Sequence, residues 1–237
     1  YYMFSECSSL SKIVIPPSVT SIKESAFSGC SSLKDITISP FVTCIEDSSF
    51  SDCSLLGEIT IPSTVTSFGY SVFNGCISLK KVTFNFPMES IHESTFSNCS
   101  SLEHFEIPSY VTKIECNAFI GCSSLKQITI PPSVTSIDDY AFSGCSSLKQ
   151  IEIPSSVSLI GSYAFDGCSS LIEVIIPSSV TSIEPFTFNE CTSLKKIEIP
   201  SSVTSIKMFA FSKCTSFVKF TVPSSITSIG ESVFNEC

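Results

Sequence analysis

The fold is decided by the 23 residues Cys122–Gly144, which read CSSLKQITIPPSVTSIDDYAFSG. Ile128 and Ile130 alternate with polar residues, and this period of two with β-branched side chains predicts a short, half-buried strand. Pro131 ends the strand, because proline has no backbone donor to give to a ladder. The unit therefore begins with one strand that has an apolar face and a polar face.

The rest of the unit predicts an outer wall and a turn back to the start. Val134 and Ile137 point inward from a second extended stretch, and Ala141-Phe142 predicts a short helical or 3-10 turn on the far side. Gly144 tolerates positive φ before the next strand. Other repeats place Gly, Asp or Asn at this turn. We expect the turn to differ toward the two ends of the chain, at Glu6, Glu190, Lys213 and Glu236.

The unit recurs along all 237 residues without an insertion or a deletion. Phenylalanine occupies one register in steps of 23 from Phe4 to Phe234, which predicts a spine of stacked rings. Cysteine occupies another register at Cys7, Cys30, Cys53, Cys76, Cys99, Cys122, Cys145, Cys168, Cys191, Cys214 and Cys237. A repeat of 20–29 residues is typical of a leucine-rich-repeat solenoid, in which each repeat forms one coil stacked on the next.

We therefore predict one array over residues 1–237, with ten 23-residue repeats at 8–237 after a partial repeat at 1–7. Neither end has a polar cap, and solenoids need caps, so we expect this chain to be a fragment of a longer array. The chain begins in phase with the repeat and not with a signal peptide.

Composition limits the partners. The net charge is −9 and every basic residue apart from the two histidines is a lysine, which argues against nucleic acid and against an anionic membrane surface. No apolar run approaches the roughly 20 residues of a membrane span. A basic protein partner or a polar ligand fits this charge better.

The cysteine register predicts buried, unbridged thiols that pack as small apolar side chains. Stacked side chains run side by side, which is poor geometry for a disulfide, and eleven is an odd number. Cys44 and Cys116 lie outside the register and are too far apart to bridge. No metal site is predicted, because the spacing is not that of zinc ligands and the two histidines occupy different registers.

The motif L-x-x-I-x-I-P-x-x-V-x-x-I-x-x-x-A-F-x-G-C, at 125–145, resembles the BspA-like (Treponema-type) leucine-rich repeat. The resemblance covers the whole chain. It implies a right-handed solenoid with a parallel strand column on its concave face and short extended or 3-10 segments on its convex side. It also implies a role like that of bacterial and protist surface antigens, several of which serve in adhesion, and it carries no catalytic residue.

The outward positions of the predicted strands vary on an otherwise constant repeat. Variable residues on a fixed scaffold are what a binding face needs, and solenoids generally bind through this surface. The alternative is a solvated sheet face without a ligand. The outward residues that we predict to contact a partner are Lys12, Asp35, Glu58, Lys81, His104, Glu106, Gln127, Gln150, Glu152, Glu173, Lys196, Glu198 and Lys219.

Three aromatic residues, Phe41, Phe86 and Tyr110, replace small residues just after the strands. If exposed, they are candidate hot spots for a partner. The alternative is that they cover a loop edge or fill a local gap. Residues 85–89, Asn-Phe-Pro-Met-Glu, depart from the usual Pro-Ser-Ser-Val-Thr, which puts the local turn there in doubt.

The Ser/Thr register around Val-Thr-Ser-Ile suggests a hydroxyl array for ice or glycan. Val134 and Ile137 flank it and point inward, so the stretch is not a flat outward strand. We expect most of these hydroxyls to bond backbone groups in turns. They therefore predict no ligand site.

These patterns favour a non-enzymatic binding or adhesion solenoid of a cell-surface or secreted protein, with a protein partner, no cofactor and no metal. With two histidines and no Gly-rich phosphate loop, the chain has no recognisable catalytic motif. The alternatives are an intracellular interaction scaffold in the cytoplasm, for which the unbridged thiols are suitable, and a structural spacer.

Overall fold

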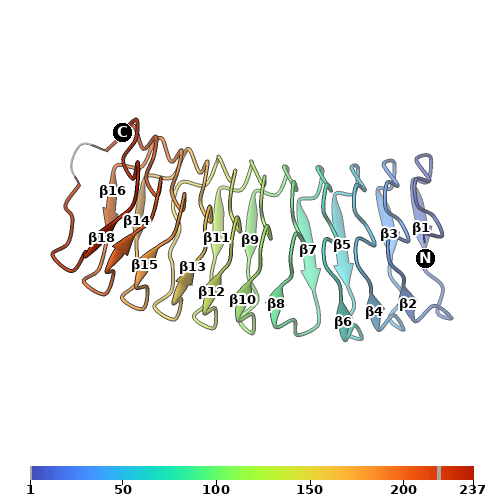
Figure 1. Ribbon diagram of the computed structural model, residues 1–237. Helices are drawn as coiled ribbons and strands as arrows, with labels where there is room; N and C mark the ends of the chain where they lie inside the picture. Colours follow the sequence, from blue (N-terminus) through green and yellow to red (C-terminus); the bar gives the residue numbers. More distant parts are fainter. Residues whose placement is uncertain (1, 218–219) are drawn as a thin grey trace.

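The computed structural model describes residues 2–217 and 220–237. Over these residues the chain winds into a parallel β-solenoid without a helix, and the two ends of the chain lie at opposite ends of the array (Figure 1). Each strand pairs in parallel with a strand 23 residues away, as Gln127 does with His104. The pairing register equals the repeat length, so the predicted stack of parallel coils is confirmed. We name each coil by its cysteine; the Cys122 coil is residues 122–144.

The first strand column holds the longer strands, which form where isoleucine or valine alternates with polar residues. Its members are β1 (Lys12–Val14), β3 (Asp35–Thr37), β5 (Glu58–Ile61), β7 (Lys81–Phe84), β9 (His104–Glu106), β11 (Gln127–Thr129), β14 (Glu173–Ile175) and β16 (Lys196–Glu198). The Cys145 coil joins this column through a single bridge between Gln150 and Glu173.

The second strand column is the second extended stretch of each unit, and its strands have two residues each. Its members are β2 (Ser21–Ile22), β4 (Cys44–Ile45), β6 (Ser67–Phe68), β8 (Ser90–Ile91), β10 (Lys113–Ile114), β12 (Ser136–Ile137), β13 (Leu159–Ile160), β15 (Ser182–Ile183), β17 (Ser205–Ile206) and β18 (Ser228–Ile229). The predicted inward direction of the apolar residues is confirmed, since Val134 and Ile137 are fully buried.

The prediction of a helical or 3-10 turn at Ala141-Phe142 is wrong. Tyr140 there has φ of 57°, in the left-handed region. The amide of Phe142 donates to the carbonyl of Ala164 in the next coil at 2.8 Å, and the amide of Gly144 donates to Asp166 at 2.7 Å. Alternate amides thus bond across coils, and only the amides between them, such as that of Ser143 to the Tyr140 carbonyl at 3.1 Å, close turns within the coil, so no helix forms.

The turns near the chain ends also differ from expectation, because they keep the common conformation. Glu190 and Lys213 have φ of 58° and 59°, close to 73° at Gly144. Glutamate and lysine pay a steric cost in this region that glycine does not. Coil stacking therefore imposes the left-handed turn even where the residue type is unfavourable.

The interior is a set of stacked columns. Phenylalanine rings of consecutive coils lie within 19° of parallel, with centroids 5.2–6.0 Å apart. From Phe50 to Phe211 these rings are completely buried. The predicted phenylalanine spine is confirmed, and it forms one continuous core with the isoleucine, leucine and valine columns.

The cysteine column adds side-chain hydrogen bonds along the stack of coils. From Cys30 onward, each thiol of the column donates to the carbonyl of a phenylalanine 26 residues earlier, at 3.0–3.3 Å. All thirteen thiols are unbridged, as predicted, and those from Cys30 to Cys214 in the column are buried, whereas Cys7 and Cys237 are exposed. Burial raises the pKa of the Cys122 thiol to about 12, so that thiol stays protonated at neutral pH.

The Ser/Thr register bonds backbone, as expected, but its partners lie in the preceding coil. The hydroxyl of Thr135 donates to the carbonyl of Thr112 at 3.2 Å, and that of Thr204 donates to Thr181 at 3.4 Å. A neighbouring register repeats the pattern, as the bond from Ser133 to Val111 at 2.6 Å shows. These hydroxyls are therefore structural links between coils.

Candidate functional site

The strand face consists of the outward side chains of the first strand column and of its bridge at Gln150. On β5, Glu58 and Thr60 are exposed, while Ile59 and Ile61 are buried. The side chains predicted to contact a partner are exposed, except that of Glu173, which is half-buried. Lys219 lies outside the described residues. The solenoid therefore brings the predicted outward residues onto one surface.

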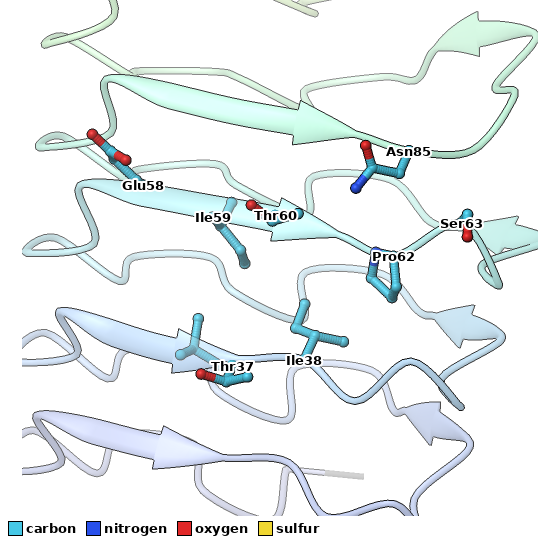
Figure 2. A pocket seen from close by; sticks show the side chains of 9 residues that line it. Thr37, Ile38, Glu58, Ile59, Thr60, Pro62, Ser63 and Asn85 are labelled. Carbon is cyan, nitrogen blue, oxygen red and sulfur yellow. The ribbon is translucent and has the colours of Figure 1, made fainter.

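Four cavities hollow the strand face. The two near the N-terminal end have volumes of about 580 and 520 Å³ and share Ile36, Thr37 and Glu58 in their walls. Figure 2 shows the second of these, with Glu58 and Thr60 on β5, Thr37 on the neighbouring strand and Asn85 after β7. Because they share these walls, the two cavities form one continuous stretch of trough.

The two cavities in the middle of the array lie beside each other. They measure about 680 and 580 Å³ and share His104, Thr129 and Ile130. Among the predicted contact residues, Lys81, His104, Glu106 and Tyr110 line the first, and His104, Gln127, Gln150 and Glu152 line the second. The middle of the strand face is thus where the predicted residues converge most closely.

The strand face has a lysine margin and a glutamate margin. The lysine margin lies just before the strand register, and its exposed lysines are Lys34, Lys80, Lys126, Lys149 and Lys195; the same register holds one exposed carboxylate, Glu103. The glutamate margin is the last outward position and holds Glu106, Glu152 and Glu198. Because the coils stack in register, the two margins run parallel along the array. The face is therefore electrically polarised across the strands.

Ion pairs within and between coils orient some of the charged side chains of the strand face. The ammonium of Lys196 lies 2.8 Å from Glu173 and 2.7 Å from Glu198, and these two carboxylates raise the pKa of Lys196. Lys126 lies 2.7 Å from Glu103 and lowers the pKa of that carboxyl. All these groups reach solvent, so each pair contributes little to stability, and their main effect is to orient the charges.

Sequence reasoning missed the lysine margin because the register lies one residue before the predicted strand. The signal was present: lysine recurs there at steps of 23 or multiples of 23, as at Lys34, Lys80 and Lys126. A comparison of every register for charge, and not of the strand positions alone, would have found it.

The three aromatic candidates, Phe86, Tyr110 and Phe41, differ in how far their side chains are exposed. Phe86 is 4% exposed and packs with Phe68 and Phe84 at ring distances of 5.7 and 5.8 Å, so it fills a local gap and is not available to a partner. Tyr110 is 39% exposed, and its hydroxyl donates to the Phe86 carbonyl at 2.8 Å. Phe41 is 57% exposed. Only Phe41 and Tyr110 therefore remain as surface candidates.

One cluster away from the strand face has residue types that are used in catalysis. His92 Nδ1 lies 3.3 Å from Glu115 Oε1, and the buried Ser90 hydroxyl donates to the same oxygen at 2.6 Å. A nucleophilic hydroxyl needs a direct hydrogen bond to its base, but here the Ser90 hydroxyl and the His92 ring each bond the Glu115 carboxylate. The carboxylate also accepts the amide of Glu93 at 3.1 Å. The cluster thus links two coils and has no nucleophile–base pair.

Within residues 2–217 and 220–237, no group of three or more His, Cys, Asp or Glu side chains is placed to hold a metal ion. No helix in the same residues is long and apolar enough to cross a membrane. For binding, the described surface has its hollowed, polarised strand face and its exposed aromatic residues, and also an apolar cavity of about 450 Å³ near the N-terminal end, with Met3, Phe4 and Val14 in its wall.

Comparisons with solved structures find bacterial solenoids. A leucine-rich repeat protein from Bacteroides ovatus is 27% identical over 100% of this chain and 79% of its own, with a TM-score of 0.69. One from Eubacterium ventriosum is 33% identical over 67% of this chain, with a TM-score of 0.60, and this chain spans only 43% of its length. A leucine rich cell surface protein from Faecalibacterium prausnitzii is 29% identical over 82% of this chain and 61% of its own, with a TM-score of 0.55.

No curated protein matches the chain. The family described as the BspA type leucine rich repeat region, in six copies, matches residues 1–126 and again residues 112–237. These two matches cover every residue, in agreement with the repeat, the columns and the parallel coils described above. The chain belongs to the BspA-type leucine-rich-repeat family.

Proposed function

We propose that this chain is a binding module that holds a protein partner on its strand face and serves in adhesion. The observation that supports this most is that the residues varying between coils line a trough with lysine along one margin and glutamate along the other. The buried columns hold this surface rigid, so binding costs little ordering of the module. Polarised margins favour one orientation of a partner with complementary charges.

Reversing the glutamate margin tests the proposal. The double variant Glu152→Lys with Glu198→Lys is expected to weaken binding of its partner at least tenfold, because two attractive contacts become repulsive. The measurement is surface-based binding of the purified chain to a panel of purified extracellular proteins. The matched control is Glu89→Lys with Glu231→Lys, which makes the same change in net charge at exposed positions outside the first strand column.

A partner that binds the wild type and the control alike, but not the Glu152/Glu198 variant, supports the strand face. Equal loss in both double variants would mean that general charge attraction is responsible. Unchanged binding in both would place the contact elsewhere on the surface.

We further propose that the module is displayed on a cell surface. The support is the similar protein from Faecalibacterium prausnitzii, which is described as a cell surface protein. The unbridged thiols by themselves favour a reducing compartment. Burial nevertheless protects most of them, since it raises the pKa of thiols such as Cys145 well above the usual value. Protease added to intact producing cells is expected to cleave the protein; full protection until lysis would favour the intracellular scaffold.

A further inference from the structure

A second aromatic column runs along the outside of the C-terminal half. The outer aromatic column consists of Tyr140, Tyr163, Phe186 and Phe209, from four consecutive coils. Its ring centroids are 4.5, 4.4 and 4.8 Å apart, and its rings lie within 9° of parallel. These distances are shorter than any in the interior phenylalanine spine. Unlike the spine, the four rings are half-buried and reach solvent.

The backbone at these positions makes the column unusual. All four residues have φ between 54° and 58°, in the left-handed region, where bulky residues are uncommon. Six other coils place small polar residues at the same register with the same backbone, and the partial repeat has Tyr2 there: the six are Ser25, Ser48, Ser71, Ser94, Asn117 and Ser232. The fold therefore does not need aromatic rings here. Because the backbone is left-handed at this register in every coil, what distinguishes these four consecutive coils is the bulky aromatic residue type placed there.

Apolar neighbours widen the strip. Met208, next to Phe209, is 41% exposed, and Pro185, next to Phe186, is half-buried. Aromatic residues and methionine are enriched where protein surfaces meet partners. None of these residues lines the cavities of the strand face, so the strip is separate from the site proposed above.

Ring orientation limits what this strip can bind. The rings stack face against face, so their faces are covered except at the two ends of the column, and their edges are what solvent reaches. A sugar packing flat on a ring would need an open face. The outer aromatic column instead offers a narrow apolar ridge, which suits aliphatic chains laid across it.

A row of polar side chains runs beside the ridge. Asp166 accepts from Asn189 Nδ2 at 2.7 Å and from the Ser143 hydroxyl at 3.4 Å. Desolvation raises the pKa of this half-buried carboxyl, and Asp166 in turn contributes to raising the pKa of Tyr163. The side chains that bond Asp166 are thus uncharged.

Charge beside the ridge is mostly negative. Asp138, Asp139, Asp166 and Glu184 lie close to the rings in sequence, with one lysine, Lys207, immediately before them. Lys113 also acts on Asp138 and Lys213 on Asp166, but Glu115 and Glu190 act on the same two carboxyls in the opposite sense. In the part of the chain that the structure describes, no salt bridge joins Asp138, Asp139, Asp166, Glu184 or Lys207. Lysine and arginine combine an aliphatic stem, which can cover ring edges, with a cationic head, which can reach these carboxylates.

We propose that the outer aromatic column is a second docking surface, which binds a polypeptide segment carrying lysine or arginine side chains. The partner's aliphatic stems lie across the ring edges between Tyr140 and Phe209. Its cationic heads pair with the carboxylates beside the ridge. This surface can be occupied while the strand face holds a different partner.

The test separates the contribution of the aromatic rings to binding from the contribution of charge. The probe is a labelled deca-lysine peptide, and the variant is Tyr163→Ser with Phe186→Ser, which keeps every charge and installs the residue found at this register in other coils. We expect the dissociation constant to rise at least tenfold in the variant. Tyr70→Ser is the control, because Tyr70 is exposed but lies outside the column; it should bind like the wild type.

Thermal melting checks the fold of each variant. If the double variant does not fold, the single variant Tyr163→Asn, which introduces the residue type that Asn117 has at the same register, is expected to weaken binding at least threefold. Deca-lysine binding that is unchanged by loss of the rings would overturn the proposal, since it would reflect only the net charge of −9. Column-dependent binding of deca-glutamate or of an oligosaccharide, without deca-lysine binding, would also overturn it.

Discussion

Replacing Phe142 by alanine is expected to lower the free energy of unfolding by about 3–5 kcal/mol. The ring is completely buried and stacks on Phe119 and Phe165 at 5.4 and 5.5 Å. Its removal leaves a cavity in the middle of the spine, and both neighbours lose one face of contact. Because stability in a solenoid depends on each interface between adjacent coils, one cavity weakens two interfaces.

Urea unfolding followed by circular dichroism measures this effect. Phe41→Ala is the matched control: its ring is 57% exposed, and we expect a change within about 0.5 kcal/mol. A Phe142→Ala protein that unfolds at the wild-type urea concentration would show that the spine does not hold the coils together.

Gly161→Ala is expected to destabilise the protein by about 1–3 kcal/mol through overpacking. A Cβ at Gly161 would lie 2.5 Å from Asp139 Oδ1 and 2.6 Å from the Asp139 amide nitrogen. The same aspartate accepts the amide of Ser162 at 2.7 Å. The close approach of the two coils thus depends on glycine, and the pair repeats at Asp47 and Gly69.

Gly57 gives a control of the opposite sign. A Cβ there would meet nothing within 4 Å, so Gly57→Ala should be neutral or raise stability by about 0.4–1 kcal/mol. Thermal melts of the two variants should therefore move in different directions. A Gly161→Ala protein that melts at or above the wild-type temperature would contradict the close coil contact.

The repeat predicted most of the interior because the buried positions are the ones that stacking holds constant. Each coil from the Cys30 coil to the Cys191 coil buries Phe, Cys and Leu in the same columns, so columns at Phe142 or Cys145 can be read from the 23-residue step. The direction of Val134 and Ile137 followed from the same pattern. The conformation of the turn at Tyr140 could not be predicted in this way. Alternate amides there bond carbonyls of the next coil, and this requirement leaves no pattern in the sequence of a single repeat.

The surface was predicted less well, because its residues are free to vary. Phe86 was offered as a possible contact, yet Phe68 and Phe84 create the apolar neighbourhood that buries it. The outer aromatic column escaped notice because each of its rings, such as Tyr163, looks like an ordinary variable residue within its own coil. Only the stacking of consecutive coils turns four such residues into one ridge.

Counting thiols tests most directly the central claim that the cysteines of the register are unbridged and, from Cys30 to Cys214, lie inside a stack of parallel coils. In denaturant without reductant, all thirteen cysteines are expected to react with a thiol reagent. In the native protein, rapid reaction should be confined to the exposed or half-buried Cys7, Cys44, Cys116 and Cys237, and the nine buried thiols should be protected. Three or fewer reactive thiols in denaturant, the number left by five disulfides, would contradict the account.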